Sequence, residues 1–481
     1  MIPSHVAFVA DIANLLGRKG HKVIVVDSVL RSDIGNKLDT NYIEKIIEVA
    51  TAENVEKSVS KSEIPLTFWS MRNEPEEQKE VMEQLGRLFL EQCKHLVLET
   101  NVLRELESMQ FDFGMHEVFD VCGLGIFERL KIRRSVILSS AGMRDIVNEA
   151  LGILGPLQQS SILSDYGNHV PLLETRRNLK FHSAWRNFFK VQSQELEPLF
   201  NVDGCFEQLL RYSNLMFVNT HELADSHRPW SRRVHEIGGI SFKKSKKLKE
   251  EYTEMFEKFS SVVLITFGTT TPSFLMPSEC KLTLKKVLET FPEVLFIWKY
   301  EKEDNFTKSF QKKNVLFRKY VPQVDLLESG RISLFITHGG QNSLLESFHA
   351  NVRSLVIPLF GDQHRNARIS EENGLVDVLE KRYLSNEERV EAAVKRGLSG
   401  DKPLEAKLRR VSMNLRDARQ SAERLLIASI EATYAFTSSD SHPPPNFECF
   451  PEFYNSDVIL LILDTLIFVS LVLVLKKLLF V

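Results

Sequence analysis

The stretch that most constrains the fold is FITHGGQNSLLE, residues 335–346. It begins as the end of a short apolar strand, and from Gln341 onward its composition is that of a helix. The two glycines between strand and helix let the backbone approach a ligand closely. The free N–H groups of the helix start would then point at whatever lies above the strand, and they favour an anion such as phosphate. No Gly-Lys-Ser/Thr follows and the spacing is not GxGxxG, so neither a Walker loop nor a dinucleotide fingerprint is indicated.

Strands and helices alternate along the chain, which predicts an α/β fold. In the first half we expect a helix over residues 6–16, strands at 22–27, 136–138 and 215–218, and a long helix over 81–106. In the second half we expect a parallel, doubly wound sheet with strands at 262–268, 294–300, 315–320 and 334–337. Because 481 residues exceed one ordinary core, we expect two domains, residues 1–238 and 239–435.

Polar residues follow the predicted strands of the second half. They are Thr269 to Thr271, Tyr320 and Gln323, His338 with its glycines, and Asp362 with Gln363. Two α/β domains leave a cleft between the carboxyl ends of their strands, where ligands usually bind. These residues therefore predict the rim of a binding site.

Charge and cysteine content narrow the function classes. A formal net charge of −3 favours no nucleic-acid partner. The five cysteines are scattered, odd in number and without a CxxC pair, so we expect neither a zinc site nor a disulfide framework.

The C-terminus predicts a membrane helix. Residues 457–475 are almost entirely apolar, and Lys476 and Lys477 follow. A bilayer core needs about 20 residues, so this segment suffices. The basic tail, 476–481, is then cytosolic, residues 436–456 form a spacer, and the bulk lies across the membrane. A buried core helix is one alternative; a tail anchor with the bulk in the cytosol is another, because the opening residues do not look like a signal peptide.

The segment YVPQVDLLESGRISLFITHGGQNSLLESFHANVRSLVIPLFGDQHRNA, residues 320–367, resembles the signature of the UDP-glycosyltransferases, specifically the membrane-bound animal UDP-glucuronosyltransferase group. Weaker likeness extends over most of the chain, including PSH near the start, FDFGMHEVFDVCGLGIF and VNTHELADSHRPWSRRVHEIGGI. The resemblance implies two facing Rossmann-like domains, the GT-B fold, with the nucleotide sugar held mainly by the second. It also implies a single-pass membrane protein of the endoplasmic reticulum with lumenal catalytic domains.

The resemblance further implies a donor site in the second domain, whose residues each bind one part of a UDP-sugar. These are Tyr320 for stacking on uracil, Gln323 for the base edge, His338, Gly340, Asn342, Ser343 and Thr269 for the diphosphate, Glu346 for the ribose hydroxyls, and Asp362 and Gln363 for the sugar hydroxyls. If the sugar is glucuronate, His364 and Arg365 are candidate cations for its carboxylate; glucose is the alternative donor sugar.

The family's reaction is sugar transfer with inversion at the anomeric carbon. The resemblance matches its base, a histidine at the start of the first helix, to His5. That imidazole needs an acidic partner, for which Glu117 is the first candidate and Asp120 the second. Helix dipole, N–H groups and His338 can stabilise the leaving UDP, so no metal and no cofactor beyond the co-substrate is expected.

Two departures from the family pattern affect these expectations. Only Met1 and Ile2 precede the PSH loop, so we expect the first domain to lack an inner strand. A non-catalytic, membrane-anchored UDP-sugar binder is therefore the alternative function. Asn351 and Arg353 stand where the family usually has Gly and Pro, so that turn must be rebuilt. The remaining expected partners are a small lipophilic acceptor, membrane lipid, and as an open option a second copy of the chain. The aromatic region 150–215 fits an apolar acceptor pocket and fits core packing equally well.

Overall fold

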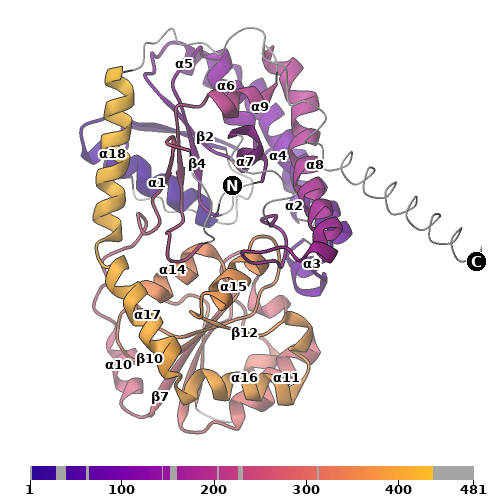
Figure 1. The fold of residues 1–481 in the computed structure, drawn as a ribbon, viewed down its shortest axis with the longest axis vertical. Helices are drawn as coiled ribbons and strands as arrows, with labels where there is room; N and C mark the ends of the chain where they lie inside the picture. The colour runs from indigo at the N-terminus through magenta and orange to yellow at the C-terminus, as the bar shows by residue number, and fades with distance from the viewer. Residues whose placement is uncertain are drawn as a thin grey trace, which may run out of the picture.

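The computed structural model describes residues 3–28, 40–60, 64–142, 145–151, 160–202, 205–225, 231–310 and 314–436. They form two α/β halves stacked along the long axis of the molecule (Figure 1). The predicted membrane helix, 457–475, and its basic tail lie outside these residues. Among the residues described, no helix is both long enough and apolar enough to cross a bilayer.

The C-terminal half is built on one parallel sheet of six strands in the order β12-β11-β10-β7-β8-β9. Their bounds are β7 Ser261–Thr266, β8 Val294–Lys299, β9 Val315–Arg318, β10 Ile332–Thr337, β11 Ser354–Val356 and β12 Asp377–Val378. The central strands are continuous apolar runs because helices cover both faces of a parallel sheet. The doubly wound sheet predicted from the sequence is confirmed.

Short connections join these strands to the helices that cover them. The helices are α10 Glu250–Phe256, η2 Ser273–Leu275, α11 Ser278–Glu289, α12 Asn305–Lys308, α13 Gln323–Leu327, α14 Gln341–His349, α15 Gln363–Glu372, η3 Lys381–Tyr383, α16 Glu387–Ser399 and α17 Lys402–Leu415.

The N-terminal half contains two separate parallel sheets among its described residues. One pairs β1 Ile24–Ser28 with β2 Lys45–Val49, and the other has the order β3-β4-β5-β6. The second comprises β3 Gly114–Glu117, β4 Ser135–Ser139, β5 Leu215–Val218 and β6 Val234–Glu236. Neither β1 nor β3 has a further hydrogen-bonded strand on its other edge within the described ranges. The predicted lack of an inner strand stays a prediction.

Helices surround these sheets, and two of them are long. The helices are α1 Pro3–Arg18, α2 Glu53–Ser60, α3 Ile64–Ser70, α4 Pro75–Leu98, α5 Thr100–Glu107, α6 Cys122–Arg129, α7 Asp145–Leu151, η1 Leu172–Glu174, α8 Thr175–Phe200 and α9 Phe206–Tyr212. The helix predicted over 81–106 is thus two helices, separated at Glu99. The α8 aromatics Trp185, Phe188 and Phe189 are fully buried in the core, so they pack this half together rather than line an open pocket.

The last described helix, α18 Ala418–Phe436, returns to the N-terminal half (Figure 1). Its buried residues Ala422, Leu426 and Ile430 share one core cluster with residues of α1, β4 and β5. The segment predicted as the C-terminal domain, 239–435, therefore supplies a helix to the packing of the other half.

A disulfide joins Cys93 in α4 to Cys122 at the start of α6, with a Cα–Cα distance of 5.8 Å. The expectation of no disulfide was wrong. Cysteine spacing and count carry no information about which helices pack together, and the buried free thiol of Cys280 contributes to the odd count.

Candidate active site between the two halves

The imidazole of His338 lies at the carboxyl end of β10, enclosed by glycines. A Cβ added at Gly340 would lie 2.6 Å from its Nε2 atom, and one added at Gly268 would lie 2.7 Å away. Gly268 also has a φ of +78°, which disfavours other residues. Burial, together with the positive charge of Lys299, lowers the pKa of His338 to about 4. The ring is therefore neutral at physiological pH and can donate one hydrogen bond.

The start of α14, directly beside His338, has no side-chain cap. Gly340 occupies the N-cap position, and no side chain accepts a hydrogen bond from the first turn. These N–H groups carry the positive end of the helix dipole, which suits an anion. Gly340 and Asn342 lie at this turn and Thr269 is exposed after β7, so the residues predicted to bind the diphosphate share one sheet edge.

Gln323 and Glu346 form a hydrogen-bonded pair beside this turn. Gln323 Nε2 donates to Glu346 Oε2 at 2.7 Å and to the Ser343 hydroxyl at 3.2 Å, and its Oε1 accepts from Thr266 at 2.8 Å. The Gln323 amide is thus held by protein partners and orients Glu346. Its predicted reading of the uracil edge stays a prediction.

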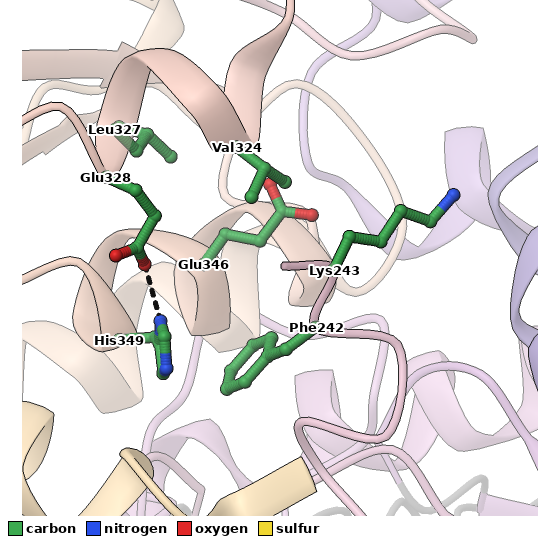
Figure 2. A pocket seen from close by; sticks show the side chains of 7 residues that line it. All are labelled: Phe242, Lys243, Val324, Leu327, Glu328, Glu346 and His349. Carbon is green, nitrogen blue, oxygen red and sulfur yellow. Dashed lines mark hydrogen bonds and ion pairs between the residues drawn. The ribbon is translucent and has the colours of Figure 1, made fainter. Parts of the chain in front are cut away.

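Glu346 faces a small pocket lined by both charged and apolar side chains. Figure 2 shows its carboxylate between Val324 and Lys243, with the His349–Glu328 ion pair, 2.5 Å from Nδ1 to Oε1, beside it. Burial raises the pKa of Glu346 to about 7, and the hydrogen bond from Gln323 offsets part of that effect. The predicted uracil platform, Tyr320, is 75% exposed just after β9, which leaves its ring face free to stack.

Asp362 and Gln363 begin α15 after β11. Gln363 is buried and its Oε1 accepts from the backbone N–H groups of Leu359 and Phe360, while Asp362 Oδ2 accepts from Asn366 at 2.9 Å. These contacts fix both side chains at the sheet edge. Their binding of sugar hydroxyls stays a prediction.

The two cations considered for a glucuronate carboxylate are not available. Arg365 is buried and donates to Asp225 of the N-terminal half at 3.0 Å. Burial lowers the pKa of His364 to about 4, so it carries no charge at neutral pH. The sequence suggested both because they follow Gln363, but a helix directs successive residues to different faces.

In the N-terminal half, His5 lies in the first turn of α1 against Glu117 at the end of β3. His5 Nδ1 is 3.3 Å from Glu117 Oε1, and the imidazole edge meets the Phe119 ring at 5.0 Å between centroids. Glu117 is buried and accepts hydrogen bonds from the N–H and hydroxyl groups of Ser140. An N–H at Nδ1 facing the carboxylate leaves Nε2 free to accept a proton.

Asp120, the second candidate partner, is directed elsewhere. Its carboxylate accepts from the Cys122 N–H at 2.8 Å and lies 3.5 Å from His116 Nε2. The structure thus brings His5 together with Glu117 and keeps Asp120 at the start of α6.

The sheet that carries Glu117 meets the start of α14 across the interface between the two halves. Asn219, directly after β5, donates from Nδ2 to Asn342 Oδ1 at 2.6 Å. Asn219, Ser140 and Lys299 were not predicted as site residues, although all three stand at or just past strand ends. The rule that selected His338 would have found them if applied to every strand.

Comparisons with known proteins identify a family for the chain and a shared fold. The family model described as "UDP-glucoronosyl and UDP-glucosyl transferase" matches residues 1–413. A Caenorhabditis elegans protein whose name assigns it to the UDP-glucuronosyltransferases, ugt-55, is 62% identical over 98% of this chain and 92% of its own length. A second from the same organism, ugt-56, is 42% identical over 97% of this chain and 88% of its own.

Solved structures share the fold. Phytolacca americana UGT2, complexed with UDP-2fluoro-glucose and pterostilbene, has a TM-score of 0.61 and 14% identity over 90% of this chain and 97% of that one. Medicago truncatula UGT71G1, complexed with UDP-glucose, has a TM-score of 0.58 and 16% identity over 88% and 95%. Both are GT-B glycosyltransferases in architecture, and the likeness extends to both halves.

Proposed function

Because this chain belongs to the UDP-glucuronosyl and UDP-glucosyl transferase family and is a UDP-glycosyltransferase of the glucuronosyltransferase type, we propose that it transfers glucuronate or glucose from the UDP-sugar to a hydroxyl of a small lipophilic acceptor. The transfer inverts the anomeric carbon. Binding of a UDP-sugar donor follows from the family; the sugar, the acceptor and the residue roles are our proposals. The comparisons give no support to the alternative of a non-catalytic binder.

One observation carries the proposal: a histidine–carboxylate pair lies at the end of one sheet, and the same sheet edge contacts an uncapped helix start in the other half through Asn219. His5 Nε2 takes the proton of the acceptor hydroxyl while that oxygen forms a bond to the anomeric carbon. The bond from the anomeric carbon to the phosphate oxygen breaks, and its electron pair leaves with UDP. Glu117 stabilises the imidazolium that results, as its 3.3 Å distance from Nδ1 allows.

The leaving diphosphate is stabilised by the turn at the carboxyl end of β10. Its charge grows as the bond to sugar breaks, so donors fixed in advance there favour the transition state over the ground state. We assign this task to the first N–H groups of α14, the neutral imidazole of His338 and the amide of Asn342. The proposed mechanism assigns the growing negative charge to these groups and uses no metal ion.

The deciding assay measures release of UDP from UDP-glucuronate and from UDP-glucose with a panel of phenols. We expect His5→Ala to lower kcat by about 10²- to 10⁴-fold, the usual contribution of a general base. Glu117→Gln should lower kcat by a comparable factor, and Asp120→Asn by far less, since the carboxylate beside His5 Nδ1 is that of Glu117, whereas Asp120 accepts from the Cys122 N–H. Full activity of His5→Ala would remove His5 from this role.

We propose that the enzyme is a single-pass membrane protein of the endoplasmic reticulum, held by residues 457–475 with its two halves in the lumen. The Cys93–Cys122 disulfide supports the lumenal side, because disulfides persist in oxidising compartments. Light scattering in detergent measures whether a second copy of the chain associates with the first.

A further inference from the structure

Asn219 is a buried amide that contacts both halves of the site without being in either set of predicted residues. It directly follows β5, and its side chain is 1% exposed. Nδ2 donates to the Ser140 carbonyl at 2.9 Å and to Asn342 Oδ1 at 2.6 Å. Both hydrogens of the amide are therefore used, one in each half of the molecule.

These contacts fix how both amides are oriented. The Ser140 carbonyl can only accept, so the atom of Asn219 beside it must be the nitrogen. The same nitrogen meets Asn342, so the atom of Asn342 that faces it must be the oxygen. The NH₂ group of Asn342 then lies on the other branch of its amide, free to donate to an anion at the start of α14.

The Ser140 contact continues to the proton acceptor. Ser140 donates from its backbone N–H and its hydroxyl to Glu117, which lies 3.3 Å from His5. Glu117, Ser140 and Asn219 stand at the ends of β3, β4 and β5, which are neighbours in one sheet. A row of polar contacts thus runs along this sheet edge from His5 to Asn342.

We propose that Asn219 is a positioning residue that turns the Asn342 amide toward the donor diphosphate and holds it in register with the His5–Glu117 pair. This inference rests on the proposed function, since it needs a diphosphate at the start of α14. Asn219 acts through Asn342 and does not itself touch the reacting atoms.

A double-mutant cycle tests the proposal. We measure kcat and KM for the UDP-sugar in Asn219→Ala, Asn342→Ala and the double variant, with UDP affinity by calorimetry. A neutral hydrogen bond of this kind is typically responsible for about a tenfold effect, so Asn219→Ala should lower kcat/KM for the donor about tenfold. The double variant should lose no more than Asn342→Ala alone, because the effect passes through that amide.

Two further variants keep the test decisive. Asn219→Asp preserves the shape but places a carboxylate against two acceptors, so it should lower kcat/KM more than the alanine variant. Thr220→Val is the matched control: Thr220 is the next buried residue, donates to Glu236 at 2.8 Å and contacts no donor-site residue by hydrogen bond. It should lower thermal stability while leaving kcat/KM unchanged.

Independent effects that multiply in the double variant, or a Thr220→Val loss as large as that of Asn219→Ala, would overturn the positioning role. The role would also be overturned if the Asn219 variants had the same kcat and KM as an active wild type. A wild type that neither binds UDP nor releases it from UDP-sugars would instead refute the proposed function.

Discussion

Replacing Glu346 by glutamine allows the stability of the fold and the binding of the donor to be tested separately. Burial raises the pKa of this carboxyl from its ordinary 4.5 to about 7, against the opposing effects of Gln323, Lys243 and His349. Because the folded-state pKa lies above the unfolded one, Glu346 contributes its full stability only below about pH 4.5. That stability is lost as pH rises through about 7. Each tenfold difference in proton affinity corresponds to about 1.4 kcal/mol, so the ionised carboxylate costs the fold up to about 3 kcal/mol at pH 9.

Glutamine keeps the shape and can still accept the hydrogen bond from Gln323, but it does not titrate. We therefore expect Glu346→Gln to be more stable than the wild type, with a difference that grows by about 2 kcal/mol between pH 5.5 and pH 9. Urea denaturation followed across this range measures it. Glu257→Gln, an exposed glutamate of the same half, is the control and should show a far smaller dependence. A difference that does not change with pH would refute the burial argument.

The functional arm uses UDP-glucose, whose phosphates do not titrate near pH 7. An ionised carboxylate is the stronger acceptor for ribose hydroxyls, so wild-type affinity should rise as pH increases through about 7. Glu346→Gln should bind about tenfold or more weakly above pH 8 and show no such rise. Equal affinities at every pH would remove Glu346 from ribose binding even if the stability result held.

Three other results follow from the geometry. Gly340→Ala should weaken UDP binding at least tenfold by calorimetry, because alanine tolerates its φ of −63° but the new Cβ would lie 2.6 Å from His338 Nε2. Gly330→Ala is the control for lost stability: its φ of +69° strains alanine, but the new Cβ meets nothing within 4 Å, so UDP affinity should not change. Replacing Cys93 and Cys122 by alanine frees a loop spanning 29 residues and should lower the free energy of unfolding by about 3 to 4 kcal/mol, and an unchanged urea midpoint would contradict this. The exposed sequon Asn305-Phe306-Thr307 should carry a glycan if the halves are lumenal, giving an endoglycosidase-sensitive mobility shift that Asn305→Gln abolishes.

The parts of the fold that the sequence predicted are those fixed by local pattern. Continuous apolar runs predicted the buried strands of the C-terminal sheet, because strands covered on both faces have no polar side. The sequence also indicated that the turn after α14 departs from the family pattern. Asn351 adopts a φ of +55° there, which asparagine tolerates better than most residues. Arg353, in place of proline, is buried and donates to the Arg396 carbonyl.

The parts that the sequence did not predict depend on contacts between distant segments. Arg365 looked like a cation for a sugar carboxylate until Asp225 of the other half proved to be its partner. The disulfide required α4 and α6 to be neighbours, and the return of α18 required its apolar face to match α1. Each depends on a tertiary neighbour that no local period or spacing encodes.

Strand order explains why residues with similar local sequence take different parts in the site. His338 and Gly268 both follow strands, and they are in contact because β10 and β7 are neighbours. Glu117, Ser140 and Asn219 form one row because β3, β4 and β5 are consecutive in their sheet. Asp120 lies within three residues of Glu117 but has already entered the turn to α6, so it cannot join that row. Two substitutions at this interface should therefore be energetically coupled when their strands are neighbours in the sheet. Their separation in the sequence should have no bearing on the coupling.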